Sequence, residues 1–482
     1  MSTTELIRPS VATRTLVADG LTPVAAYAAL RQADPGRASF LFESVVGGDR
    51  WGRYSILGYR PRYDAILGAK GWTIRGDAGV SLGIDPDSPD PLAAAEALFR
   101  ATDVAGSGNP AAKLTRASFG YLAWDLVHAI EKVPGWGGEP SLPLARFVGG
   151  ATLVVFDALA QTVTIAAERE EDVDRAHADL AVPATLRRIA LPDRTRIPPD
   201  VETDVDDAAY EAGVRRAQEY IAAGDAFQVV LARKFRVPRS GRDPFDVYRA
   251  MRVINPSPYM YFLDLPAAPG EAVRTQIMGA SPETMVRLED GVMTVRPLAG
   301  TRPRGKTLEQ DAALEKELLA DPKERAEHVM LIDLGRNDVG RVAEIGSVDL
   351  VRRMEIEKYS HVMHIVSEVQ GRVARTTPPL EVVRAAFPAG TLSGAPKVRA
   401  MQIIRELEAS PRGIYGGAVG YVAKTGDLDF AIAIRTAVCR GDVFEVTAGA
   451  GLVEASDPKS EAAETHAKAR SVLCAIEAAP RG

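Results

Sequence analysis

Hydrophobic positions along this chain follow two different patterns, on either side of a proline-rich segment. Before that segment, short runs of β-branched and aromatic residues predict strands of an antiparallel sheet, at Phe40–Phe42, Tyr54–Leu57, Leu153–Phe156 and Val163–Ala166. The segment itself, Ala181 to Asp207, holds four prolines among Asp and Arg residues, a composition that resists both helix and sheet. It predicts a linker between an N-terminal domain, residues 1–200, and a C-terminal domain, residues 206–482.

Beyond the linker, helical spacing alternates irregularly with strand-like runs. The first predicted helix has one apolar face, a capping aspartate and a terminal glycine, at Asp206, Asp207, Tyr210, Val214, Ala217, Ile221 and Gly224. Further helices are predicted at Leu308–Leu319, Lys323–Leu334, Leu380–Phe387, Ala395–Glu408 and from Pro458. Strands are predicted at Phe227–Ala232, Tyr259–Leu263, Ala418–Ala423, Phe430–Val438 and Val443–Ala448, the last leading into a glycine-rich turn. This order predicts an α+β fold with a large, mostly antiparallel sheet.

Composition narrows the class of protein without defining it. The 482 residues are 46% hydrophobic and 25% charged, which is typical of a globular protein, and the net charge of −6 weighs against nucleic-acid binding. The two cysteines, Cys439 and Cys474, form no metal or redox pattern. The first ten residues lack the apolar core of a signal peptide, and the most apolar stretch, Ala151 to Ala167, is too short to cross a bilayer. We therefore expect a cytoplasmic protein with no membrane or nucleic-acid partner.

Two pairs of glutamates stand three residues apart on predicted helices. Glu324 and Glu327 form one pair and Glu461 and Glu464 the other, with Lys468 on the same face as the second pair. Because residues three apart share a helix face, two facing pairs could hold Mg²⁺ through carboxylate oxygens. Taken alone, such pairs more often form a solvated face, so the spacing does not establish a metal site.

Other segments carry chemistry that is weak when each is taken separately. His364 has the ordinary pKa of a general base, and His361 and His328 compete with it for that role. The segment TAGAG (residues 447–451) could expose backbone N–H groups to an anion or form a simple turn. The same choice applies to TLSGAPK (391–397), and the small-residue turn PLAGTRPRGK (297–306) could contact a phosphate, a nucleic acid or a carboxylate.

The order of these segments is far more specific than any one of them. PLAGTRPRG, KERAEHVMLIDLGRNDVGRV, YSHVMH, FPAGTLSGAPK, IYGGAVGY, AIRTA and AGAGLVEASDPKSEAAET follow one another between Asp206 and Ala479. Together they resemble the chorismate-binding domain of the anthranilate synthase family, and FLFES (40–44) and GRYS (52–55) extend the resemblance to its large subunit. The resemblance implies a large, mostly antiparallel β-sandwich with helices packed outside, and an ammonia-dependent synthesis of anthranilate and pyruvate from chorismate.

The resemblance also implies roles for individual residues. Mg²⁺ would be held by Glu327 and Glu464, with Glu324 and Glu461 alongside. Substrate contacts would come from a set of backbone, hydroxyl and cationic groups, namely Gly300, Thr301, Thr391, Tyr415, Arg435, Gly449, Ala450, Gly451 and Lys468. His364 would remove the ring proton as pyruvate is eliminated, with Thr301 and Lys468 close to the reacting atoms.

Gln228 separates this chain from related activities. It occupies the position in GDAFQVVLAR (224–233) where isochorismate synthases, salicylate synthases and many aminodeoxychorismate synthases carry Lys. An amide is neither a base for water nor a nucleophile, so Gln228 favours direct attack by ammonia.

The segment NPSPYMYFL (255–263), together with FLFES, resembles the family's tryptophan inhibitor pocket. The resemblance assigns the amino group to Glu43, a hydrogen bond to Ser44, and the walls to Pro258, Tyr259, Met260, Val419 and Tyr421. The alternative is a proline-rich turn followed by a buried strand.

No segment resembles a glutamine amidotransferase, so ammonia is expected from solution or from a separate glutaminase subunit, in an α₂β₂ assembly that the family suggests. The nearest alternative is an aminodeoxychorismate synthase of folate synthesis. More distant alternatives are a water-using isochorismate or salicylate synthase and a non-catalytic, tryptophan-sensing subunit.

Overall fold

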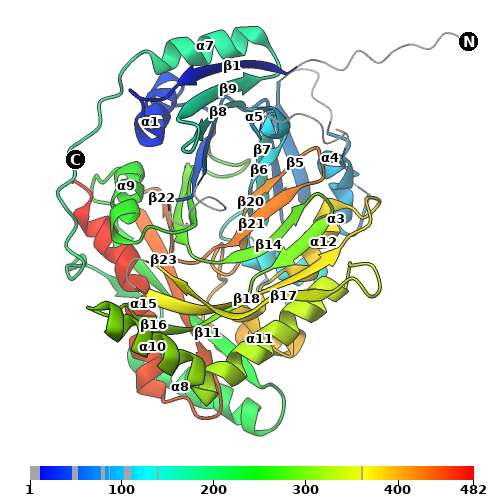
Figure 1. Cartoon of the computed structure of the whole chain (residues 1–482), viewed down its shortest axis with the longest axis vertical. Helices are drawn as coiled ribbons and strands as arrows, with labels where there is room; N and C mark the ends of the chain where they lie inside the picture. Colours follow the sequence, from blue (N-terminus) through cyan, green and yellow to red (C-terminus); the bar gives the residue numbers. More distant parts are fainter. Residues whose placement is uncertain are drawn as a thin grey trace, which may run out of the picture.

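Apolar runs of the chain form the strands of two large sheets, in which every pair of neighbouring strands is antiparallel (Figure 1). A computed structural model describes residues 11–45, 53–77, 82–85, 87–101, 110–137, 140–359 and 362–481. His361 and Gly52, which the sequence analysis named, lie outside the described residues.

The first sheet combines strands from both ends of the chain. Across the sheet, the described strands run β1 (Ala12–Val17), β9 (Thr162–Ala167), β8 (Thr152–Asp157), β3 (Tyr54–Tyr59), β2 (Ser39–Glu43), β12 (Tyr259–Leu265), β13 (Thr275–Ser281), β22 (Thr436–Arg440), β23 (Val443–Leu452), β11 (Gln228–Pro238) and β10 (Glu202–Thr203), with β19 (Gly394–Ala395) also paired to β11. The junction between the N-terminal and C-terminal strands is the pairing of β2 with β12.

The second sheet has the same mixed origin. Its described strands run β16 (Leu298–Pro303), β18 (Val362–Arg372), β15 (Val292–Val295), β14 (Thr284–Glu289), β21 (Leu428–Ile432), β20 (Ala418–Val422), β6 (Ser118–Leu122), β7 (Ala145–Gly149), β4 (Tyr63–Gly68) and β5 (Gly71–Gly76), with β17 (Asp349–Lys358) also paired to β18. Here β6, which precedes the predicted linker in the sequence, pairs with β20, which follows it. Both sheets contain strands from before and from after residue 200. The division into two domains at this point therefore stays a prediction from the sequence.

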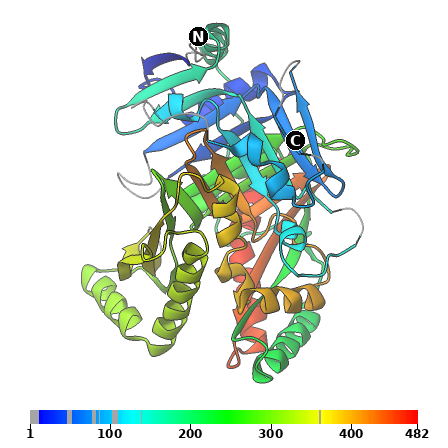
Figure 2. The ribbon, with the colours of Figure 1, turned by 90° about the vertical axis from the view of Figure 1, so that its right-hand side faces the viewer.

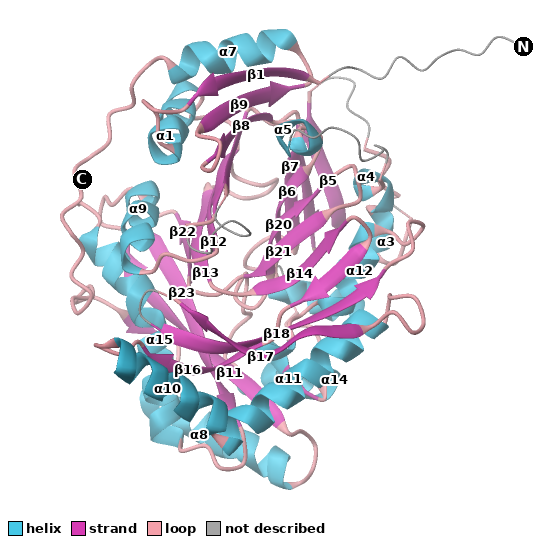
Figure 3. Cartoon of the chain, viewed as in Figure 1, coloured by secondary structure: helices cyan, strands magenta, loops and turns pink. Residues whose placement is uncertain are grey.

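Helices cover the outer faces of the two sheets (Figure 3). The described helices are α1 (Pro23–Ala33), α3 (Pro91–Ala94), α4 (Glu96–Phe99), α5 (Pro110–Leu114), the 3₁₀ helix η1 (Trp124–Leu126), α6 (Val127–Ile130), α7 (Glu170–Leu180), α8 (Asp207–Ala222), α9 (Pro244–Ile254), α10 (Leu308–Ala320), α11 (Pro322–Gly340), α12 (Pro379–Ala386), α13 (Gly390–Ser393), α14 (Lys397–Leu407) and α15 (Pro458–Ala478).

The apolar core lies in layers between these elements. One buried cluster, including Phe40, Phe119 and Tyr261, fills the space between the two sheets. A second packs α1, α7, α9 and α15 on the first sheet. A third packs α12 on the second sheet and also includes α14, which lies against β11 of the first. A β-sandwich with helices outside is therefore confirmed, and its antiparallel pairing follows from the many short strands.

Local sequence signals account for many of the element boundaries. The Asp206 side chain accepts a hydrogen bond from the backbone N–H of Ala209 and so caps α8, whose buried face holds Tyr210, Val214 and Ala217. The linker is irregular apart from the two residues of β10.

Two predicted elements are wrong. The single strand expected at Phe430–Val438 is two strands, β21 in the second sheet and β22 in the first, because the chain changes sheet at Ala433–Arg435. Arg435 has a φ of +51°, a left-handed conformation that interrupts regular strand geometry. The glycine-rich turn expected at 447–451 is instead part of β23, where Gly449 and Gly451 pair with Ala232 and Val230 of β11.

Candidate active site

The predicted base His364 lies on β18, opposite Thr301 of the neighbouring strand β16. Its Nδ1 atom is 3.0 Å from the carbonyl oxygen of Gly300 and 3.0 Å from Thr301 Oγ1. A carbonyl only accepts hydrogen bonds, so Nδ1 carries the proton and Nε2 keeps its lone pair. Burial lowers the pKa of His364 below its usual value, which leaves the ring neutral at pH 7 and suited to take up a proton.

Gly300 allows β16 to bend beside this histidine. The register with β18 shifts between Ala299 and Thr301, and Gly300 adopts a φ of +65°. A Cβ atom there would be 3.2 Å from Glu324 Oε2 and 3.1 Å from Leu318 Cδ1. The bulge therefore needs glycine for its backbone and for its close approach to the carboxylate.

The four predicted metal-binding glutamates lie on two helices that start in the same way. Asp321 and Pro322 begin α11, and Asp457 and Pro458 begin α15, with each aspartate accepting hydrogen bonds from the first turn. Figure 2 shows α10 and α11 on one side of the lower half and α15 on the other. Each pair of glutamates thus comes from the first two turns of its helix.

Electrostatic coupling connects the two helices. Burial, and then the negative charges of Glu324 and Glu464, raise the pKa of Glu327. Burial also raises the pKa of Glu461, with a contribution from Glu464. Glu464 and Glu324 are neutralised locally, by Lys468 Nζ at 2.6 Å and by Arg302 Nη1 at 3.1 Å.

These carboxylates suit a hard divalent cation in their chemistry, because their ligand atoms are all oxygen and their mutual repulsion would be relieved by positive charge. Within the described part of the chain, however, no three His, Cys, Asp or Glu side chains gather closely enough to form a ready-made metal site. Binding of a metal would therefore require the glutamate side chains to turn toward one another.

The predicted anion-binding residues surround β23. A Cβ atom on Gly449 would be 2.8 Å from the Tyr415 hydroxyl, and Lys468 Nζ donates to the Gly449 carbonyl at 3.1 Å. The side chain of Ala450 faces a buried cluster, so that residue presents only its backbone. Burial raises the pKa of Tyr415 to about 12, so its hydroxyl is protonated and can donate.

Arg435 stands out because its guanidinium has no hydrogen-bond or ion-pair partner among the described residues. Burial lowers its pKa, while Tyr415, Glu464 and Glu283 act on it only through longer-range charge. A shielded cation without a partner is unfavourable, and so is its left-handed backbone conformation. Both features are typical of a residue that receives an anionic ligand.

Gln228 begins β11, beside the short helix α13 that carries Thr391. Its backbone pairs with Ala395, and a Cβ atom on Gly451 would be 2.8 Å from its Nε2 atom. The side chain is buried, and its Oε1 atom has no hydrogen-bond partner in the described structure. That oxygen is available to accept a hydrogen bond from a ligand.

Glu283 is a candidate catalytic residue that the sequence analysis missed. Its side chain is buried and accepts a hydrogen bond from Thr391 Oγ1 at 2.9 Å. Burial raises its pKa to about 7, against the opposing charges of Lys468 and Arg435. A lone carboxylate in the apolar run IMGASPETMV (277–286) was the available signal. Its raised pKa makes it a carboxylic acid near neutral pH.

The competing histidine, His328, has the environment of a residue that stabilises the fold. It is fully buried, its Nε2 atom lies 2.8 Å from Ser367 Oγ, and burial lowers its pKa to about 4.

The seven residues predicted for the inhibitor pocket all line one cavity of about 160 Å³ between the two sheets; they are Glu43, Ser44, Pro258, Tyr259, Met260, Val419 and Tyr421. Glu43 is buried and already bound by Arg252 Nε at 2.9 Å and by the Tyr248 hydroxyl at 2.5 Å. Three charged lining residues, Arg53, Arg287 and Asp429, were not predicted. Arg287 and Asp429 come from distant strands and carried no local signal.

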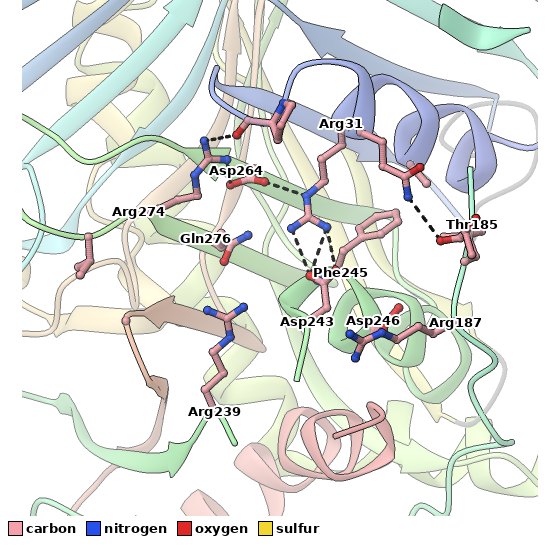
Figure 4. Close-up of a pocket in the computed structure, with 16 residues that line it drawn as sticks. Arg31, Thr185, Arg187, Arg239, Asp243, Phe245, Asp246, Asp264, Arg274 and Gln276 are labelled. Atoms are coloured by element: carbon pink, nitrogen blue, oxygen red, sulfur yellow. Dashed lines mark hydrogen bonds and ion pairs between the residues drawn. The ribbon is translucent and has the colours of Figure 1, made fainter. Parts of the chain in front are cut away.

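A larger cavity, of about 650 Å³, lies away from all of these residues (Figure 4). Arg31 of α1 binds Asp264 at 2.9 Å and Asp243 at 3.0 Å, and Arg274 binds Asp264 at 2.8 Å. The cavity is thus a seam of mutually neutralised charges that ties α1 to β12 and α9.

Comparison with known proteins agrees with the fold. Residues 67–474 match the family described as chorismate binding enzyme, and the chain belongs to that family.

Its relatives within the family are more specific. It is 43% identical to anthranilate synthase component 1 of Acinetobacter calcoaceticus, over 97% of this chain and 95% of that protein. It is 41% identical to anthranilate synthase component 1 of Cereibacter sphaeroides, over 96% and 93%. The crystal structure of anthranilate synthase component I from Streptococcus pneumoniae superposes with a TM-score of 0.75 and 33% identity, over 95% of this chain and 99% of that one. The predicted resemblance is confirmed, and the chain is a chorismate-utilising lyase. No helix among the described residues is long and apolar enough to span a membrane.

Proposed function

We propose that this enzyme converts chorismate and ammonia to anthranilate and pyruvate, with Mg²⁺ as cofactor and tryptophan as feedback inhibitor. The observation that carries the proposal is the guanidinium of Arg435, which is half-buried, has no hydrogen-bond or ion-pair partner among the described residues, and lies within charge range of Glu464. One part of the site therefore holds a cation without a carboxylate partner, and the other holds Glu327 and Glu461, which pair with no cation among the described residues. Chorismate has two carboxylates, so one can meet Arg435 while a cation joins the other to the glutamates.

Substrate binding follows from the donors around β23. Arg435, Lys468, the Tyr415 hydroxyl and the backbone of Gly449–Gly451 would receive the enolpyruvyl carboxylate. Glu327 and Glu464, with Glu324 and Glu461, would hold Mg²⁺, which would neutralise the ring carboxylate and fix its place.

Amination then needs a nucleophile and an acid. Ammonia attacks the ring and a C–N bond forms. Gln228 Oε1 can accept a hydrogen bond from an N–H group of the ammonia without removing the proton. The ring C–O bond breaks, and Glu283 donates its proton to the departing hydroxyl, which leaves as water. Thr391, which donates to Glu283 Oε1, keeps that carboxyl turned toward the site.

Elimination uses the neutral histidine. Nε2 of His364 removes the ring proton at the aminated carbon, the bond between the ring and the enolpyruvyl oxygen breaks, and the substrate ring becomes aromatic. The electron pair of that bond leaves with the oxygen, and the resulting enolate takes up a proton from water to become pyruvate. The Gly300 carbonyl supports this step, because it accepts the hydrogen bond from His364 Nδ1–H. This bond strengthens as the imidazole becomes positively charged.

A separate glutaminase subunit would supply the ammonia, in an α₂β₂ assembly. Both relatives are named anthranilate synthase component 1, and this name implies that a second component exists. An aminodeoxychorismate synthase is the alternative, and Gln228 in place of Lys argues against it.

The cavity around Tyr259 supports tryptophan feedback, because it combines apolar walls with a few buried polar groups. All the candidate catalytic groups are present, which argues against a non-catalytic sensor.

The test is steady-state anthranilate fluorescence with chorismate, MgCl₂ and an ammonium salt, for the wild type and for Arg435 variants. Arg435→Met removes charge-assisted hydrogen bonds worth about 1.5–3 kcal/mol, so the KM for chorismate should rise roughly 10- to 100-fold. Arg435→Lys retains the charge and should lose less. Arg440→Met is the matched control and should keep the wild-type KM, because it removes a guanidinium that pairs with Glu271 at the far end of β22, the strand that follows Arg435. An unchanged KM in Arg435→Met would contradict the proposal.

A further inference from the structure

A single peptide unit separates the active site from the inhibitor cavity. The chain leaves β13 of the first sheet at Ser281 and enters β14 of the second at Thr284. Glu283, the last residue before β14, bonds to Thr391 on the active-site side. Thr284 follows it directly and bonds to Tyr259, which lines the inhibitor cavity. Neighbouring residues of an extended chain point to opposite sides, so this placement follows from the backbone.

The contact between the two sites runs through hydroxyl groups. The Tyr259 hydroxyl is 2.9 Å from Thr284 Oγ1 and 3.0 Å from Asp429 Oδ1. With Asp429 ionised, Tyr259 donates to the carboxylate, and its oxygen accepts from Thr284. The orientation of the Thr284 side chain is thereby coupled to the position of the tyrosine ring.

The strand pairing at this point is irregular. The pairing of β14 with β21 is irregular between Thr284 and Val286, so Met285 lies outside the regular ladder. Glu283 is held by a hydrogen bond from the Ile432 N–H to its carbonyl at 3.0 Å and by a bond of 3.3 Å from its own N–H to Ser281 Oγ. Bulges beside active sites commonly set the aim of a side chain.

We propose that Thr284 is a positioning residue that links the two sites: a ligand packed against Tyr259 breaks the Tyr259–Thr284 hydrogen bond and turns the Glu283 carboxyl away from chorismate. This inference rests on the proposed function and specifies how its feedback works. It explains how an amino acid between the sheets can act on catalysis without entering the chorismate site. By linkage, chorismate must weaken tryptophan binding by the same factor.

The test compares the coupling between the two ligands in the wild type and in Thr284→Val, which keeps the shape but removes the hydroxyl. Tryptophan affinity is measured by calorimetry, and its effect on the KM for chorismate by anthranilate fluorescence. Thr284→Val should bind tryptophan within about threefold of the wild type, while the factor by which saturating tryptophan raises KM falls at least about fivefold, a change within the usual range of allosteric coupling. Thr284→Ser, which restores the hydroxyl, should restore the coupling.

Two further variants keep the test decisive if Thr284→Val folds poorly. Tyr259→Phe removes the other partner of the same bond and should reduce the coupling equally, and the double variant should lose no more than either single one. Tyr421→Phe removes a hydroxyl from the same cavity that is not bonded to Thr284, and should keep the coupling.

Wild-type coupling in both Thr284→Val and Tyr259→Phe would overturn the inference. So would a Thr284→Ser variant that behaves like Thr284→Val, since packing alone would then be responsible. A wild-type enzyme that forms anthranilate but shows no response to tryptophan would instead contradict the proposed feedback, and the inference with it.

Discussion

Glu283 and His364 are both shielded from water, and this burial shifts their pKa values in opposite directions. Removing a carboxylate from water favours its protonated form, so the pKa of Glu283 rises to about 7. Removing an imidazolium from water favours the neutral ring, so the pKa of His364 falls. Near neutral pH the site therefore holds a protonated acid and an unprotonated base together, which is what amination followed by elimination requires.

This pairing predicts the pH dependence of catalysis. At constant free ammonia, kcat/KM for chorismate should fall as pH rises through about 7, because Glu283 then loses the proton it must donate. Glu283→Gln should abolish that limb and lower the rate by roughly 10²- to 10⁴-fold. Glu289→Gln, an exposed change at the far end of β14, the strand that directly follows Glu283, should leave the limb in place. A limb that persists in Glu283→Gln would assign the proton to another group.

At the scale of elements, the bulge in β16 positions three groups at once. Gly300 supplies the carbonyl that orients His364, and its missing side chain leaves room for Glu324. Thr301, on the other side of the bulge, reaches the same imidazole nitrogen. The geometry of base and glutamate thus depends on one left-handed glycine.

Gly300→Ala should therefore damage activity more than stability. The left-handed backbone costs an L-residue about 1–2 kcal/mol, and the new methyl group would also press on Glu324 and Leu318. We expect a several-degree fall in Tm by calorimetry together with at least about a tenfold loss of kcat/KM, because misplaced catalytic groups lose rate steeply. Gly346 has a φ of +78°, and a Cβ atom there would have no atom within 4 Å. Gly346→Ala should therefore lower stability but leave activity unchanged. Equal activity losses in the two variants would refute the role given to Gly300.

Helix starts and strand periods were predictable because their signals are local. Asp321 with Pro322 and Asp457 with Pro458 mark α11 and α15 in the sequence, and the caps form as the residue types suggest. Arg435 shows the limit of such signals. It lies in an apolar run that resembles one strand, and only the passage between two sheets gives it a left-handed backbone.

The candidate site was predictable where the family motifs contain it and not elsewhere. His364, Gly300 and the four glutamates lie inside ordered motifs. Glu283 and Asp429 do not, because a lone carboxylate in a strand gains meaning only from partners more than a hundred residues away, Thr391 for one and Tyr259 for the other. The inhibitor cavity was predicted as a set of residues, but the ion pair that already engages Glu43 was not.

At the scale of the whole molecule, the two sheets bring together sites that the sequence separates. The N-terminal strand β2 pairs with β12, which places Glu43 beside Met260 and builds the inhibitor cavity between the sheets. The N-terminal strand β6 pairs with β20, which follows Tyr415 of the active site. Neither site is contained in one half of the chain, so regulation and catalysis share one folded unit.

In the proposed reaction ammonia is the nucleophile, and it adds at the ring position that anthranilate requires. The most direct measurement is to incubate the purified enzyme with chorismate, MgCl₂ and ¹⁵N-ammonium, and to separate the products by chromatography with mass detection. We predict a single aromatic product, ¹⁵N-labelled anthranilate, formed together with pyruvate in equal amount. A labelled 4-amino product, or unlabelled isochorismate, would contradict the account and show that Gln228 does not determine the reaction.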